Sequence, residues 1–210
     1  MNKNNKLHWN KVYKKQEINQ LGWYEENPEP SLRLIEKCDL KKHDRIIVVG
    51  SGASTLVDKL IEKGFEKIIC NDISNSGLHE LKQRLESNSE KVQWLVDDLT
   101  NATELENLSP VDLWHDRAVL HFFTEPADQQ SYFKLLKKIV KNKGYVIISE
   151  FNLEGADKCT GLPVFRYSKE ALQEELGEDF ELISSFNHTY TQPSGNTREF
   201  IYTLFQRNRI

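Results

Sequence analysis

The fold is decided by residues 45–55, which read RIIVVGSGAST. The run IIVV is apolar and β-branched, which is typical of a buried strand. Gly50 and Gly52 then permit a tight turn, and apolar residues recur at helical intervals from Leu56 onward. A buried strand that passes through glycines into a helix predicts an α/β sheet whose ligand lies beyond the carboxyl end of that strand.

Strands and helices alternate on both sides of this stretch. The expected strands cover residues 45–50, 67–70, 92–96, 111–114 and 144–149, and the expected helices cover 32–38, 56–61, 74–85 and 128–140. This alternation predicts an α/β, Rossmann-like three-layer sandwich, in which helices cover both faces of a mostly parallel sheet. The last third differs, because a helix over 168–176 is followed by strands over 180–186 and 199–205. These two strands predict an antiparallel hairpin at the C-terminal end of the sheet.

Composition limits the class of protein. The 210 residues suffice for one core, so we expect a single domain over residues 1–210. The 28 basic and 32 acidic residues give a net charge of −4, which disfavours nucleic acid and anionic membranes as partners. The apolar runs are too short to span a membrane, and we expect no cleaved leader. Three widely spaced cysteines fit the reduced thiols of a cytoplasmic protein better than disulfides or a metal site, and we expect Cys38 and Cys70 in the core.

Polar residues follow the first two strands, where open α/β sheets bind their ligands. The N–H groups of the loop Gly50-Ser51-Gly52 and of the helix after it can hold a carboxylate. Asp72, with Ile73 beside it, follows the second strand at the distance from the glycines at which an acid reaches a ribose. One carboxylate can accept hydrogen bonds from both ribose hydroxyls. A simple helix N-terminal acid is the alternative for Asp72.

The third and fourth strands also end in ionisable residues. After the third strand, Asp98 can accept a hydrogen bond from an adenine amine while Leu99 packs on the base, although Asp98 could instead cap a short helix. His115, Asp116 and Arg117 stand at the end of the fourth strand, where the reacting part of a ligand is normally bound. The alternative there is a structural ion pair between Asp116 and Arg117, with His115 as a neighbour.

Two kinds of ligand are candidates for these strand ends: a nicotinamide dinucleotide and an adenosyl compound with an amino-acid tail. A nicotinamide dehydrogenase would normally have a third glycine at the position of Thr55. An adenosyl ligand with an amino-acid tail needs an acid for its ribose, an acid for its adenine and a glycine turn for its tail. The sequence supplies this second set.

Six separated segments resemble, in order, those of a branch of the class I S-adenosylmethionine-dependent methyltransferases. They are WNKVY (9–13), WY (23–24) before SL (31–32), GSGASTLVD (50–58), DIS (72–74), DLWHDRAVLHF (112–122) and CTGLPVFRY (159–167). The resemblance implies a seven-stranded sheet with an antiparallel last strand and S-adenosylmethionine as cofactor. It implies Gly50 and Gly52 beside the methionine part, Asp72 on the ribose and Asp98 near the adenine. The chain departs from the family pattern at Val48, where such enzymes usually carry an acid.

Large aromatic side chains precede the first strand. They are Trp9, Tyr13, Trp23 and Tyr24. We expect residues 1–40 to form a helical lid over a cofactor-binding core of residues 41–210, with Tyr13, Trp23 and Tyr24 on the cofactor. The alternative is that all four aromatics pack permanently on the helices.

The sequence thus predicts methyl transfer from S-adenosylmethionine to an acceptor that is a small molecule or a protein side chain. Asp116 is the expected acceptor-orienting residue, and His115 is the second candidate for this role and a neighbour of the cofactor. Two alternatives remain open: a catalytically degenerate protein that only binds S-adenosyl ligands and, with less support, a nicotinamide-dependent oxidoreductase.

Overall fold

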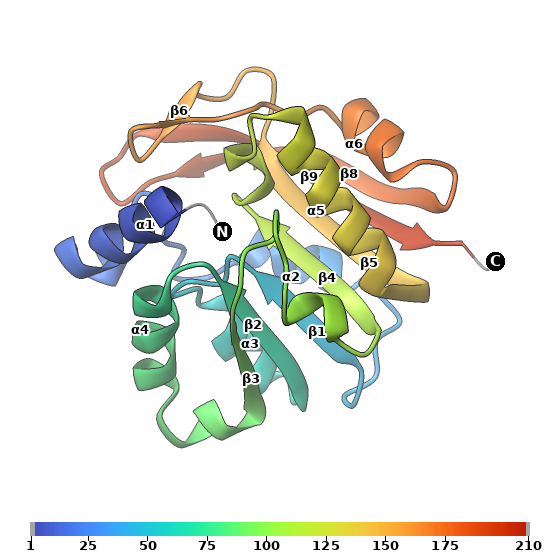
Figure 1. Cartoon of the computed structure of the whole chain (residues 1–210), viewed down its shortest axis with the longest axis horizontal. Helices are drawn as coiled ribbons and strands as arrows, with labels where there is room; N and C mark the ends of the chain where they lie inside the picture. Colours follow the sequence, from blue (N-terminus) through green and yellow to red (C-terminus); the bar gives the residue numbers. More distant parts are fainter. Residues whose placement is uncertain (1–2, 209–210) are drawn as a thin grey trace.

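The structure is a computed structural model that describes residues 3–208. Its centre is a seven-stranded sheet in the order β3-β2-β1-β4-β5-β9-β8 (Figure 1). The strands are β1 (Arg45–Val49), β2 (Lys67–Asp72), β3 (Val92–Val96), β4 (Val111–Arg117), β5 (Val140–Phe151), β8 (Phe180–Thr191) and β9 (Thr197–Arg207). Strand β9 is antiparallel to both of its neighbours, whereas β3, β2, β1, β4 and β5 pair in parallel. The predicted mostly parallel sheet with a C-terminal antiparallel hairpin is therefore confirmed.

Helices cover both faces of this sheet (Figure 1). They are α1 (Lys3–Lys15), α2 (Glu29–Ile35), α3 (Leu56–Glu62), α4 (Asn75–Leu85), α5 (Pro126–Ile139) and α6 (Lys169–Leu176). Because side chains alternate along a strand, β1 serves two cores: Ile46 and Val48 pack with α2, α3 and α4, whereas Ile47 and Val49 pack with α5 and α6. The β-branched run is buried on both faces, as the sequence predicts.

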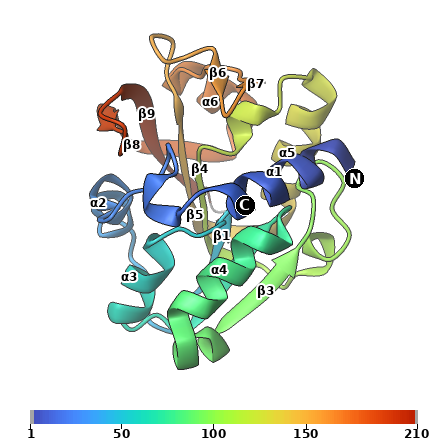
Figure 2. The same cartoon turned by 90° about the vertical axis from the view of Figure 1, so that its left-hand side faces the viewer.

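Helix α1 lies across the carboxyl ends of the parallel strands, next to α4 (Figure 2). Its lysines Lys11, Lys14 and Lys15 are exposed. A small hairpin of β6 (Lys158–Cys159) and β7 (Leu162–Pro163) follows β5. The N-terminal helix thus borders the end of the sheet where a ligand is expected.

Strand β4 is longer than predicted. The sequence places its end at Trp114, but parallel pairing continues through Asp116, opposite Val49 of β1, and through Arg117, opposite Ser149 of β5. The last three residues of β4 are therefore extended, and their side chains alternate between the two faces of the sheet.

Two further expectations concern the cysteines and the membrane. Cys38 and Cys70 are buried as predicted, and both are free thiols, as is Cys159. Within residues 3–208, no helix has both the length and the apolar character needed to cross a membrane.

Candidate cofactor-binding and active site

A cavity of about 440 Å³ lies at the carboxyl ends of β1, β2 and β3, in the size range of small-molecule sites. Predicted residues along its wall are Tyr13, Trp23, Gly50, Asp72, Ile73, Asp98 and Leu99. They come from three neighbouring strand ends and from the N-terminal segment. The topology thus brings together most of the residues that the sequence assigns to the cofactor.

A second cavity of about 50 Å³ is lined by the loop that follows β1. The predicted residues along its wall are Ser51, Tyr24 and His115. Trp23, Gly50 and Arg117 line both cavities. The predicted residues Gly52 and Asp116 line neither.

The loop after β1 requires its two glycines. Gly50 and Gly52 have φ angles of +54° and +44°, in the left-handed region that side chains disfavour. A Cβ atom at Gly50 would overlap Val119, and one at Gly52 would overlap the hydroxyl group of Tyr13. The main chain of the loop is therefore approached closely from the segment after β4 and from α1.

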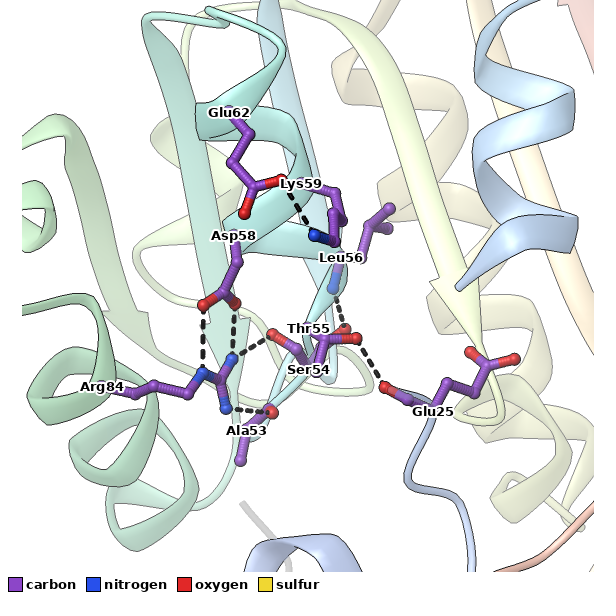
Figure 3. Close-up of polar contacts among 9 residues, drawn as sticks. All are labelled: Glu25, Ala53, Ser54, Thr55, Leu56, Asp58, Lys59, Glu62 and Arg84. Atoms are coloured by element: carbon purple, nitrogen blue, oxygen red, sulfur yellow. Dashed lines mark hydrogen bonds and ion pairs between the residues drawn. The ribbon is translucent and has the colours of Figure 1, made fainter. Parts of the chain in front are cut away.

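A residue of α4 fixes the other side of this loop. The guanidinium of Arg84 donates to the carbonyl oxygens of Ala53 (2.8 Å) and Ser54 (2.7 Å) and pairs with Asp58 of α3 at 2.6 Å (Figure 3). The hydroxyl of Thr55 donates to the carbonyl of Glu25 at 2.7 Å. The loop is thus held from α4 and from the N-terminal segment.

Val48 stands at the position where such methyltransferases usually carry an acid, and it lines the 50 Å³ cavity but not the 440 Å³ cavity. Val48 is 2% exposed and packs in the core between the sheet and α2, α3 and α4. The contacts of Arg84 fix the loop in a chain that has no carboxylate at this position.

Asp72 is a buried residue of the cavity wall. Its Oδ2 accepts a hydrogen bond from the N–H of Gly52 (2.8 Å), and its Oδ1 accepts one from the N–H of Ser74 (2.7 Å). Burial raises the pKa of Asp72 to about 6, although the N–H groups of Ser74 and Gly52 favour the ionised carboxylate. This carboxylate both organises the glycine loop and lines the cavity.

The two acids after β3 have different surroundings. Asp97 accepts hydrogen bonds from the N–H groups of Thr103, Glu104 and Leu105, each at 2.9 Å, so it organises the turn before β4. Oδ1 of Asp98 accepts from the N–H and the hydroxyl of Thr100. Both acids line the cavity, and Asp98 combines a local capping bond with a place in the cavity wall.

Asp116 and His115 point to opposite faces of β4. Asp116 faces α5, where its carboxyl group accepts hydrogen bonds from the hydroxyl of Tyr132 (2.7 Å) and the N–H of Val119 (3.1 Å). Burial, and then the neighbouring Glu150, raise the pKa of Asp116 well above its usual value. Asp116 is completely buried and lines neither cavity. Its side chain therefore has no surface on which an acceptor could make contact.

His115 faces α2, where its Nε2 lies 2.9 Å from the hydroxyl oxygen of Ser31. Burial, and then the Arg117 guanidinium, lower the pKa of His115 to about 3, so the ring is neutral. The alternative interpretation, a structural ion pair between Asp116 and Arg117, is wrong. These adjacent strand residues point to opposite faces of the sheet, and Arg117 forms its ion pair with Glu25 at 3.0 Å.

The N-terminal aromatics form one cluster on the cavity. The ring of Trp23 contacts those of Trp9 and Tyr13 at centroid distances of 5.7 and 5.9 Å, and Trp9 also contacts Phe122 at 4.9 Å. Burial, and then Asp72, raise the pKa of Tyr13 well above its usual value. Tyr24 lies outside this cavity, and its carbonyl accepts a hydrogen bond from the hydroxyl of Tyr190.

Several lining residues are not among the predicted cofactor contacts. They include Trp9, Arg117, Val119, Phe122, Asp128 and Cys159. All of these except Asp128 stand in motifs that the sequence analysis singles out. Asp128 follows no strand, and its position depends on how α5 packs. Long-range packing, which has no local signal, brings these residues to the site.

Comparisons with known proteins identify the family and the fold. Residues 40–209 match the family model described as a methyltransferase domain. No curated protein matches the chain by sequence.

Solved structures share the fold at low sequence identity. An S-adenosylmethionine-dependent methyltransferase from Anabaena variabilis is 14% identical, with a TM-score of 0.77 over 97% of this chain and 93% of that chain. The N-methyltransferase NodS from Bradyrhizobium japonicum, solved with S-adenosylhomocysteine, is 12% identical, with a TM-score of 0.71 over 95% of this chain and 98% of that chain.

A third similar structure is the 1,6-didemethyltoxoflavin-N1-methyltransferase of Burkholderia thailandensis, at 14% identity and a TM-score of 0.67, covering 98% of this chain and 85% of that chain. The family model covers well over half of the sequence. The chain therefore belongs to the methyltransferase domain family, which confirms the predicted class I S-adenosylmethionine-dependent methyltransferase.

Proposed function

We propose that the 440 Å³ cavity binds S-adenosylmethionine and that the chain transfers its methyl group to an acceptor that reaches the site past the N-terminal aromatics. The observation that carries this proposal is the convergence of Gly50, Asp72 and Asp98 on one cavity from the ends of three adjacent strands.

The residues present fit this cofactor. Asp72 supplies a buried carboxylate for two ribose hydroxyls, and Asp98 supplies an acceptor for an adenine amine. Leu99 and Phe123 offer apolar surface for the base, and the glycine loop offers main-chain N–H groups for a carboxylate. When bound, the cofactor would supply a methyl group on a positively charged sulfur, open to attack by a lone pair of the acceptor, with S-adenosylhomocysteine as the leaving group.

The protein's own contribution is orientation and exclusion of water. Well-oriented reactants can gain roughly 7–11 kcal/mol from proximity alone. Trp9, Tyr13 and Trp23 cover the cavity, and we propose residues 1–40 as the lid of a core formed by residues 41–210. Tyr13 lies against Gly52, so its hydroxyl is placed beside the end of the site proposed for the methionine part.

The proposal gives Asp116 a positioning role. Its carboxyl group holds the N–H of Val119, whose side chain lines the cavity and covers Gly50. His115 is neutral and 3% exposed, and it supports the wall of the small cavity from the side of α2.

Two measurements test the function. Calorimetric titration should show binding of S-adenosylhomocysteine and none of NAD, and the reverse result would contradict the cofactor assignment. Incubating fractionated cell extract with methyl-labelled cofactor should then place label in small molecules or in protein bands. Cofactor binding without any label transfer would support the catalytically degenerate alternative.

A further inference from the structure

Arg117 is the only basic side chain along the wall of the 440 Å³ cavity within residues 3–208. It extends from the central strand β4 on the face of α2 and lines both cavities. Carboxylates gather elsewhere on the wall, at Asp72, Asp97, Asp98 and Asp128. The cavity therefore combines four acids with one guanidinium.

The guanidinium of Arg117 is held rigidly. Its Nε donates to the hydroxyl of Tyr202 at 3.0 Å and lies 3.0 Å from Oε2 of Glu25, and its Nη1 donates to the carbonyl of Trp23 at 3.1 Å. The rings of Tyr190 and Phe200 each lie 5.0 Å from its central carbon. These contacts leave the side chain 10% exposed and fix the plane of the guanidinium group.

One nitrogen of this guanidinium group lacks a hydrogen-bond partner among the described residues. Nη2 of Arg117 is buried and has no hydrogen-bond partner in the part of the chain that the structure describes. Buried polar groups are normally bonded, and an unpaired charged donor is costly. Because Nη2 belongs to a residue of the cavity wall, a ligand group is the natural partner.

The guanidinium group of Arg117 indicates which kind of ligand group would bind at Nη2. A rigid guanidinium with free N–H groups prefers the planar, charged oxygens of a carboxylate to a neutral acceptor. Glu25, whose Oε2 lies 3.0 Å from Nε of Arg117, offsets part of this positive charge but leaves Nη2 without a partner within residues 3–208.

We propose that Arg117 binds a carboxylate of the methyl acceptor, so that the substrates are acidic molecules. This inference rests on the proposed function. Trp9, Trp23 and Phe122 line the same cavity as Arg117 and offer apolar surface for the body of such an acceptor. The cofactor's own carboxylate is the other source of this chemistry, but the glycine loop already offers N–H groups for that tail.

The test compares Arg117→Gln with the double variant Glu25→Gln/Arg117→Gln, which leaves no buried charge unpaired. The exposed Arg166, which bonds the carbonyl of Leu153, provides the control Arg166→Gln. The probes are phenylacetate and its neutral analogue phenylacetamide, titrated against the complex with S-adenosylhomocysteine. S-adenosylhomocysteine and 5′-methylthioadenosine, which lacks the amino-acid tail, are titrated separately.

We expect phenylacetate to bind the wild type and the control at least tenfold more tightly than phenylacetamide, and the double variant to lose this preference. The ratio of the affinities for S-adenosylhomocysteine and 5′-methylthioadenosine should be the same in all variants, because Arg117 does not hold the cofactor's amino-acid tail. Equal binding of acid and amide to the wild type would overturn the proposal. So would a variant that binds S-adenosylhomocysteine weakly but 5′-methylthioadenosine normally, because Arg117 would then hold the cofactor's tail. A wild type that binds no S-adenosylhomocysteine would instead contradict the proposed function itself.

Discussion

The N–H of Gly52 donates a hydrogen bond of 2.8 Å to the carboxylate of Asp72. This bond joins the loop after β1 to the end of β2, and the other oxygen of the same carboxylate accepts from Ser74 at the start of α4. The residue expected to bind the ribose therefore also builds the loop expected to bind the methionine part. Cofactor affinity and local stability are coupled through one side chain.

Substitution of Asp72 tests this coupling. Asp72→Ala should weaken S-adenosylhomocysteine binding by about tenfold or more and should also lower the free energy of unfolding by roughly 1–3 kcal/mol, because two buried N–H groups lose their acceptor. Calorimetry and thermal unfolding measure the two effects. Asp39→Ala, at an exposed residue before β1, is the control. Unchanged affinity in Asp72→Ala would remove the residue from the ribose site.

Cofactor binding should depend on pH through the same carboxylate. The pKa of Asp72 is raised to about 6 by burial, and ribose hydroxyls donate to the ionised form. Protonation below pH 6 therefore competes with binding, so S-adenosylhomocysteine should bind roughly tenfold more weakly at pH 5 than at pH 7. Calorimetry across this range checks the slope. Asp72→Asn should bind weakly at both pH values, and a variant with the wild-type slope would assign the titration to another group.

The strand β1, the glycine loop and the start of α4 could be predicted because their signals are local. The run IIVV and the two glycines specify β1 and its turn, and Ser74 accepts from the N–H of Gly77 as an N-cap. The orientation of Asp116 could not be predicted in this way, because it depends on how far β4 pairs with its neighbours. The ion pair of Arg117 and Glu25 joins segments far apart in the sequence, so no local sequence pattern predicts it.

Arg84 should affect the binding of the cofactor's methionine part, which we place on the loop after β1. Arg84→Gln removes the ion pair with Asp58 and the donors to Ala53 and Ser54. We expect S-adenosylhomocysteine to bind about fivefold more weakly, a loss of about 1 kcal/mol, whereas 5′-methylthioadenosine should bind as before. Lys59→Gln, which breaks the exposed pair of Lys59 and Glu62 on α3, is the control. Equal losses for both ligands would mean that Arg84 supports the whole cavity.

Two substitutions of Asp116 separate a positioning role from direct action on the acceptor. Asp116→Asn keeps one acceptor oxygen but turns its NH2 group toward the other donor, so it should lower the free energy of unfolding by roughly 1–2 kcal/mol and leave label transfer measurable. Asp116→Ala leaves the hydroxyl of Tyr132 and the N–H of Val119 without an acceptor and should cost roughly 2–4 kcal/mol. A stable Asp116→Asn protein that binds cofactor but transfers no label would show that the carboxylate itself acts on the acceptor.

The N-terminal helix should close over bound cofactor. Tyr13 of α1 packs against the glycine loop, and Trp9 contacts both Trp23 and Phe122 at the cavity wall. A ligand that fills the cavity adds contacts to these rings, so amide hydrogen exchange of residues 8–24 should slow when S-adenosylhomocysteine binds. Mass spectrometry of exchanged peptides measures this effect.

Removing the helix tests the same idea from the other side. Deletion of residues 1–16 spares Leu21, Trp23 and Glu25, which pack on the loop and on Arg117. The truncated protein should therefore stay folded, because the sheet and its two cores do not include α1, yet it should bind S-adenosylhomocysteine at least tenfold more weakly. Lys14→Ala, on the exposed side of α1, should match the wild type in both measurements. Equal protection of residues 8–24 with and without ligand, together with a truncated protein that unfolds, would make α1 a permanent part of the core and remove its role as a lid.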